Sequence, residues 1–85
     1  MNKLLCFTAD WCKPCQNMKP TIKSLVEKYG DRVQVFNVDT NLQERAQYGV
    51  GAVPTFVLVN ASGTILDTKI GSATKGALEH LLGTH

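Results

Sequence analysis

Two cysteines three residues apart carry the chemistry that this sequence offers. They lie in the stretch Trp11-Cys12-Lys13-Pro14-Cys15, which follows a short apolar run and precedes a run with helical spacing. A C-x-x-C pair at the junction of a strand and a helix is a candidate redox dithiol. Such a pair takes up or releases two electrons as it opens or closes a disulfide.

The start of a helix favours a negatively charged sulfur. The first N–H groups of a helix have no partner within it, and these donors and the helix dipole attract negative charge. Because the thiolate is the nucleophile, we expect Cys12, the outer sulfur, to attack, and Cys15, one turn later, to resolve the mixed disulfide. Pro14 suits the first helical turn, and Lys13 adds a cation that favours ionisation.

Two other interpretations of the pair are weaker. Structural zinc also uses C-x-x-C, but it needs four ligands, and the remaining candidates are Cys6, His80 and His85. No second pair is present, and Cys6 belongs to the apolar run before the motif, so we expect no metal. An inert pair of small core residues is disfavoured because Trp11 and Lys13 indicate a surface location.

The composition indicates one small domain, over residues 1–85, that can form a core. Of its residues 44% are hydrophobic and 19% are charged, and the net charge of +2 is spread along the chain. We therefore expect no nucleic-acid partner. The chain has no apolar run near the ~18 residues of a membrane span and no signal-peptide cleavage pattern. We expect no membrane association and a cytoplasmic location, where C-x-x-C is more often catalytic than structural.

Hydrophobic periodicity predicts four strands and three helices. Strands are expected at residues 2–7, 33–38, 56–59 and 64–70, and helices at 13–29, from the capping residues 39–41 to 47, and at 74–82. The first helix is expected to stop at Gly30 and to bury one face, made of Met18, Ile22, Leu25, Val26 and Tyr29. The last helix is expected to end at Gly83 and to bury Leu78, Leu81 and Leu82.

The order β-α-β-α-β-β-α predicts an α/β fold. The helix between the first two strands makes them parallel, and a turn cluster at residues 60–63 makes the last two strands a hairpin. Strand 64–70 alternates apolar and charged residues, so one of its faces is expected to be wetter. The expected architecture is a mixed four-stranded sheet with helices on both faces.

With Val53-Pro54-Thr55 later in the chain, the W-C-x-P-C motif resembles the thioredoxin family, and the resemblance extends over essentially the whole sequence. It implies a minimal thioredoxin fold and a thiol–disulfide oxidoreductase that reduces protein disulfides. It also implies that Pro54 is cis and faces the dithiol. By resemblance, the apolar contact surface around Cys12 is formed by Trp11, Pro14, Val53, Pro54 and Gly71.

The resemblance also implies the partners. No cofactor is expected, since the Cys12–Cys15 disulfide is itself the redox group. Substrates would be disulfide-containing proteins, and the electron donor would be a thioredoxin-reductase-type flavoprotein or glutathione. A monomer is expected.

The sequence departs from the family pattern at several positions. The usual thioredoxin begins with an extra strand and helix before the position of Asn2, so the strand at 33–38 is expected at a sheet edge. Cys6 stands where the family has a buried acid, and Val35 where it has that acid's lysine partner. We expect Cys6 to be an inert core thiol rather than a third redox thiol. Lys13 stands where many thioredoxins have glycine.

Two alternative functions remain open. A glutaredoxin-like protein acting on glutathione mixed disulfides fits the size, but Gly71 is followed by Ser72 instead of the second glycine that glutaredoxins use. A non-catalytic binding module on the same fold is the other alternative. The intact pair of Cys12 and Cys15 disfavours it, because binding alone does not need two thiols.

Overall fold

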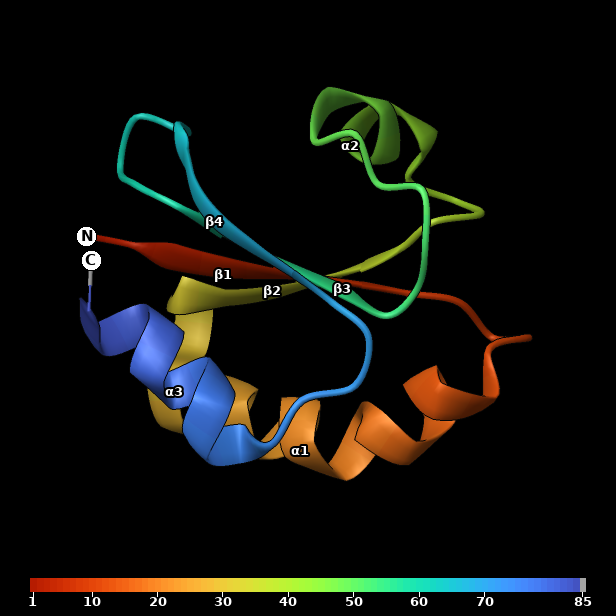
Figure 1. Ribbon diagram of the computed structural model, residues 1–85, viewed down its shortest axis with the longest axis horizontal. Helices are drawn as coiled ribbons and strands as arrows, with labels where there is room; N and C mark the ends of the chain where they lie inside the picture. Colours follow the sequence, from red (N-terminus) through yellow and green to blue (C-terminus); the bar gives the residue numbers. More distant parts are fainter. Residues whose placement is uncertain (85) are drawn as a thin grey trace.

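Four strands form one mixed sheet in the computed structural model, which describes residues 1–84 (Figure 1). The strands are β1 (Lys3–Thr8), β2 (Val33–Asn37), β3 (Thr55–Val59) and β4 (Ile65–Ile70). Their order across the sheet is β2-β1-β3-β4, so β2 and β4 are the edges. β2 runs parallel to β1, and β3 runs antiparallel to both β1 and β4. The expected edge position of β2 and the β3–β4 hairpin are confirmed.

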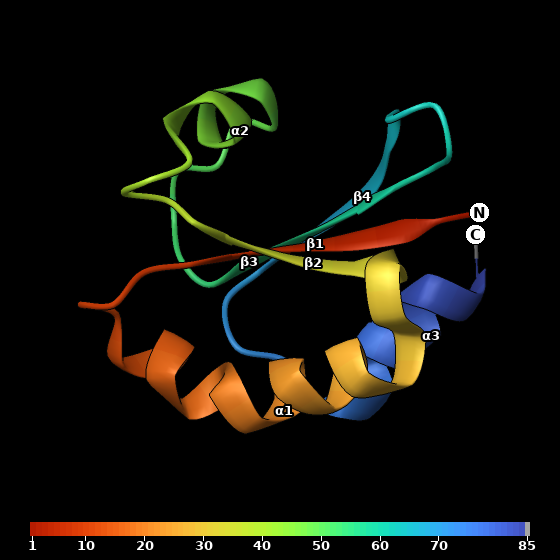
Figure 2. The ribbon, with the colours of Figure 1, turned by 180° about the vertical axis from the view of Figure 1, so that it is seen from behind.

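Helices cover both faces of this sheet. They are α1 (Lys13–Tyr29), α2 (Leu42–Gln47) and α3 (Lys75–Thr84), with a short 3₁₀ turn, η1 (Gly30–Arg32), after α1. α1 and α3 lie side by side below the sheet and α2 lies above it, as Figures 1 and 2 show from opposite sides. The predicted α/β fold class is therefore confirmed. No helix of the described chain is long and apolar enough to cross a membrane.

The core has two apolar layers because successive strand residues point to opposite faces. In β1, Leu4 and Cys6 face α1 and α3, whereas Leu5 and Phe7 face the other side. The first layer contains Leu4, Cys6, Met18, Ile22, Leu25, Val33, Phe56, Leu58, Leu78 and Leu82. The second contains Leu5, Phe7, Ala9, Cys12, Cys15, Val38, Val50, Val57 and Val59, so it includes both motif cysteines.

Helix α1 has the bounds that the periodicity predicts. It ends at Gly30, whose φ of 58° is favourable for glycine alone. Its buried face differs in two of the expected residues, because Val26 is 38% exposed and Tyr29 is half-buried. Leu25 and Val26 are neighbours on a helix, about 100° apart around its axis, and only Leu25 faces the sheet.

Three further expectations about the elements are wrong. Both faces of β4 are exposed, because this edge strand lies outside the cover of the helices. Helix α3 continues through Gly83, since a glycine lowers helix propensity by only about 1 kcal/mol and does not force an end. Asn41 precedes α2 without capping it through its side chain, which instead donates to the carbonyl of Asn37.

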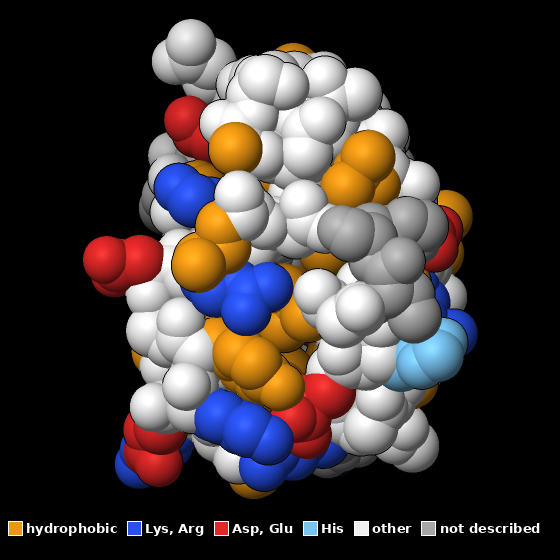
Figure 3. Space-filling view, turned by 90° about the vertical axis from the view of Figure 1, so that its left-hand side faces the viewer, with side chains coloured by type: hydrophobic (Ala, Val, Ile, Leu, Met, Phe, Trp, Pro, Cys, Tyr) orange, Lys and Arg blue, Asp and Glu red, His pale blue; other side chains and the backbone are white. Residues whose placement is uncertain are grey.

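The C-terminal helix is anchored to α1 by a polar cluster at the end of the molecule that Figure 3 presents. Lys28 and Tyr29 both donate to the carboxylate of Glu79 on α3, at 2.6 and 2.5 Å. These hydrogen bonds lower the pKa of the Glu79 carboxyl group, and the bond from Lys28 has the largest effect. Arg32 in η1 donates to the carbonyls of Asn2 and Leu82, so it connects the segment after α1 to the N-terminal and the C-terminal segments of the chain.

Candidate active site

The backbone at the end of β1 places Cys12 as the N-cap of α1. Cys12 has extended φ and ψ of −90° and 112°, and its N–H donates to the carbonyl of Ala9 at 3.3 Å. The N–H of Cys15 donates to Sγ of Cys12 at 3.2 Å. A helix N-terminal donor therefore points at the sulfur that we expect to attack, where it stabilises a thiolate.

The two motif cysteines form a disulfide with Cα atoms 5.2 Å apart. Cys12 is 5% exposed and Cys15 is 1% exposed, so the outer position of Cys12 is preserved, although both are largely buried. Lys13 and Pro14, which lie between the two cysteines in the sequence, are exposed to solvent. The two cysteines are one turn of helix apart, which lets the pair open and close without a change of fold.

A second loop lies against the dithiol. The Val53–Pro54 peptide bond is cis, and the carbonyl oxygen of Val53 is 3.6 Å from Sγ of Cys12. The expectation of a cis proline that faces the dithiol is thus confirmed. The N–H of Gly71, whose φ of 96° favours glycine, donates to the carbonyl of Pro54 at 2.8 Å. Pro54 is buried, whereas Val53 and Gly71 are half-buried, so Pro54 adds little side-chain surface.

The tryptophan of the motif has a partner that sequence reasoning missed. Trp11 is 70% exposed, and its Nε1–H donates to Asp39 Oδ2 at 2.9 Å. Asp39 follows β2, so this bond joins the loops after two neighbouring parallel strands. The sequence contained only a general signal, that parallel strands end at the same edge of a sheet, and this does not single out Asp39 as the partner of an exposed indole.

A small hollow of about 40 Å³ lies beside Trp11, between α2 and the Val53 loop. Its walls include Arg45, whose Nε–H donates to the carbonyl of Val50 at 3.3 Å. Arg45 is a second site residue that the sequence did not reveal, because it comes from α2 and depends on the tertiary fold. The hollow extends the surface around Cys12 toward α2.

Cys6 is a free thiol that is completely buried in the layer under α1. Burial raises the pKa of the Cys6 thiol to about 12, as expected for a core cysteine. In the sheet Cys6 pairs with Val35 on β2. The positions that by resemblance would hold an acid and a lysine are thus neighbours here, and neither is charged at neutral pH.

The other candidate metal ligands are not gathered around the dithiol. Within residues 1–84 no three His, Cys, Asp or Glu side chains are grouped so as to hold a metal ion. His80 is exposed on α3, and His85 lies outside the described residues. The site has the donor set of a thiol redox pair.

The thioredoxin family model matches residues 2–84, nearly the whole chain. The chain belongs to the thioredoxin family. It is 35% identical over 81 residues to thioredoxin of Bacillus subtilis, covering 93% of this chain and 77% of that protein. It is 36% identical to thioredoxin of Acidithiobacillus ferridurans, covering 93% of this chain and 74% of the relative.

Solved structures of the family have the same fold. Oxidised mitochondrial thioredoxin 3 of Saccharomyces cerevisiae is 35% identical, with a TM-score of 0.77 and coverage of 93% of this chain and 74% of that one. The reduced thioredoxin pre-protein of Schistosoma mansoni is 27% identical, with a TM-score of 0.83 and coverage of 95% and 75%. With the Cys12–Cys15 pair, these relatives identify a thiol–disulfide oxidoreductase that reduces protein disulfides. The family implies disulfide-containing proteins as substrates and a reductase as electron donor.

Cys6 gives a prediction for stability at alkaline pH. The folded protein holds the Cys6 proton more tightly than the unfolded chain, since burial raises its pKa from 9.0 to about 12. That preference stabilises the fold fully below about pH 9 and is lost as the pH rises toward about 12. Between these limits the free energy of unfolding of the parent should fall, relative to Cys6→Ala, by about 1 kcal/mol per pH unit.

Urea unfolding of both reduced proteins at a series of pH values measures this difference. The comparison cancels the titration of lysines and tyrosines, which both proteins share. A gap between parent and Cys6→Ala that stays constant from about pH 8 to about pH 11 would contradict the prediction.

Proposed function

We propose that Cys12 is the attacking sulfur and Cys15 the resolving sulfur in this reduction. The hydrogen bond from the Cys15 N–H to Cys12 Sγ is the observation that carries the assignment. The Cys12 thiolate attacks one sulfur of a substrate disulfide, and the other substrate sulfur leaves as a thiolate and takes up a proton. Cys15 then attacks Cys12 Sγ, the mixed disulfide breaks, and the substrate's second sulfur leaves. Two electrons pass from the dithiol to the substrate.

The surface around Cys12 is proposed to receive an extended segment of the substrate protein. Exposed Trp11 and Pro14 flank Cys12 in the sequence, and the carbonyl oxygen of Val53 lies 3.6 Å from its Sγ. Gly71 supports this backbone through its bond to the carbonyl of Pro54. Backbone groups at such a loop bind a segment of any sequence, which suits a reductase of many substrates.

The assignment of the two sulfurs predicts that Cys15→Ser accumulates a covalent mixed disulfide with a substrate protein. Cys12 still attacks in this variant, but no second sulfur is present to release the substrate. Cys12→Ser is the matched control and should accumulate none, because buried Cys15 does not attack first. Non-reducing gels and mass mapping after incubation with an oxidised test protein measure the adduct. Equal trapping by the two variants would refute the assignment.

We also propose that the electron donor is a flavoprotein reductase rather than glutathione. The observation that supports this proposal is that Gly71 is followed by exposed Ser72, whereas a glutathione site would need a second glycine there.

We propose the cytoplasm as the location of the protein, because the free thiol of Cys6 and a reducible dithiol suit a reducing compartment. Cell fractionation tests this location.

The donor proposal predicts rapid re-reduction of the Cys12–Cys15 disulfide by NADPH with a bacterial thioredoxin reductase. Glutathione with its own reductase should sustain turnover at least about ten-fold more slowly, a difference of roughly 1.4 kcal/mol in the barrier. The rate of disulfide reduction in a test protein, measured with either donor system, decides. Faster turnover with glutathione would favour the glutaredoxin-like alternative.

A further inference from the structure

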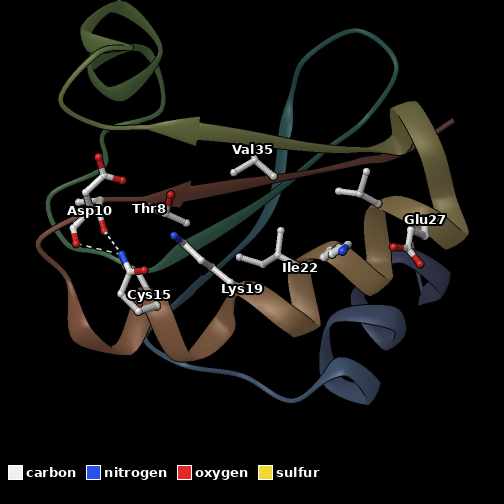
Figure 4. A pocket seen from close by; sticks show the side chains of 11 residues that line it. Thr8, Asp10, Cys15, Lys19, Ile22, Glu27 and Val35 are labelled. Atoms are coloured by element: carbon white, nitrogen blue, oxygen red, sulfur yellow. Dashed lines mark hydrogen bonds between the residues drawn. The ribbon is translucent and has the colours of Figure 1, made fainter.

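A groove of about 590 Å³ lies between α1 and the β2 edge of the sheet, and the buried cysteine of the dithiol forms part of its wall (Figure 4). The groove is lined by Thr8, Ala9, Asp10, Cys15, Gln16, Lys19, Ile22, Lys23, Val26, Glu27 and Val35. Val26 and Val35, which is 49% exposed, contribute apolar surface to this groove. Cys15, although almost completely buried, therefore forms part of the wall of a groove that is open to solvent.

The resolving step needs a thiolate at Cys15. The thiol must lose its proton before Cys15 Sγ attacks Cys12 Sγ, since the thiolate is the nucleophile. Cys6, in the layer below, cannot accept this proton near neutral pH, because burial keeps its own thiol protonated. The groove provides the remaining route, from Cys15 to solvent water, and any charge along it affects how readily the thiolate forms.

Lys19 is the charged side chain of the groove best placed to act on Cys15. It is four residues after Cys15 on α1, so the two lie on the same helix face with Cβ atoms about 5–6 Å apart. Side chains on a helix lean toward its N-terminus, here toward Cys15. Figure 4 shows Lys19 extending along the groove in this direction.

The other charged groups of the groove are less favourably placed. Lys23 is eight residues after Cys15, about 12 Å further along the helix axis, and Glu27 is another turn beyond it. Asp10 precedes the motif at the end of the groove nearest the dithiol, and its negative charge opposes a thiolate. A cation close to Cys15 acts against this negative charge.

We propose that Lys19 is a positioning residue for the second half of the reaction, in which its ammonium group stabilises the Cys15 thiolate while the thiol proton leaves through the groove to water. Lys19 takes part in no bond change. Cys15 Sγ then bonds to Cys12 Sγ, the Cys12–substrate bond breaks, and the substrate sulfur departs as a thiolate that water protonates. The inference rests on the proposed roles of Cys12 and Cys15.

The first test follows ionisation of Cys15 directly. In a Cys12→Ser background with ¹³C-labelled cysteine, the Cβ chemical shift of Cys15 is recorded against pH, free of coupling to the Cys12 thiol. The buried Cys6 thiol, whose pKa is about 12, gives a separate signal that titrates only at higher pH. Lys19→Met should raise the midpoint of this titration by about 0.5 pH unit, and Lys19→Glu should raise it further. Lys19→Arg keeps the charge, so its Cys15 midpoint should equal that of the Cys12→Ser protein without a change at Lys19.

Lys23→Met is the matched control, because it removes the same charge from the same groove two turns from Cys15. Its midpoint should move by less than about 0.2 pH unit. Equal shifts in Lys19→Met and Lys23→Met would overturn the proposal, as would a Lys19→Met midpoint at the parent value. Each variant is used after its thermal unfolding shows that it is folded, and Lys19 is exposed, so the fold should tolerate all of them.

The second test measures the resolving step with all the cysteines present. The reduced protein reacts with Ellman's reagent, releasing one thionitrobenzoate as Cys12 attacks and a second as Cys15 resolves. Stopped-flow absorbance should show the second phase slowed about two-fold in Lys19→Met below the Cys15 midpoint, with the first phase unchanged. A slowed first phase with an unchanged second phase would overturn the proposal.

The proposed roles of the two cysteines and the proposed role of Lys19 are refuted by different results. If Cys15→Ser does not trap a substrate protein, the proposed roles are wrong whatever Lys19 does. If Cys15→Ser traps normally but Lys19→Met titrates and resolves like the parent, only the role of Lys19 is wrong.

Discussion

The hydrogen bond from the Cys15 N–H to Sγ of Cys12 is the interaction on which the redox site depends. It exists because β1 ends where α1 begins, so that Cys12 is both the last extended residue and the cap of the helix. The free N–H groups of the first turn then face a sulfur instead of water. The buried strands β1 and β3 hold this junction and the Val53–Pro54 loop at the same end of the sheet.

The charges around the pair are arranged differently on its two sides. In the core layer that faces α1, Cys6 is paired in the sheet with Val35 and neither carries a charge at neutral pH, so no buried ion needs a partner. Beside the dithiol, the groove between α1 and β2 brings charged side chains into contact with solvent and with the wall that Cys15 forms. In the proposed mechanism, the ionisation of the Cys15 thiol is therefore set by charges at the surface and not by buried charges. Salt and single substitutions can change the effect of surface charges.

The sequence predicts the local features of this protein well. Periodicity predicts the bounds of α1, whereas the edge position of β2 and the cis bond at Pro54 follow from the resemblance to the thioredoxin family. The errors at Gly83 and Val26 come from local rules that tertiary packing decides: a glycine does not have to end a helix, and an apolar residue beside a stripe does not have to be covered.

The features that the sequence did not predict are those that join distant elements. The bond from Trp11 to Asp39, the Arg45 hollow and the groove beside Cys15 each combine residues from separate strands, helices or loops. No periodicity or spacing relates such residues, because their proximity is created only when the sheet pairs β1 with β2. Position along α1 nevertheless contained the relation between Cys15 and Lys19, four residues apart.

The role of Cys12 as the attacking sulfur is tested most directly by the order in which the three thiols react. Fully reduced protein is treated near neutral pH with an excess of iodoacetamide, and peptide mapping of samples taken over time locates the label. We expect that Cys12 is labelled first, that Cys15 follows slowly and that Cys6 stays unlabelled until the protein unfolds. Preferential labelling of Cys15 or Cys6 in the folded protein would contradict this expectation.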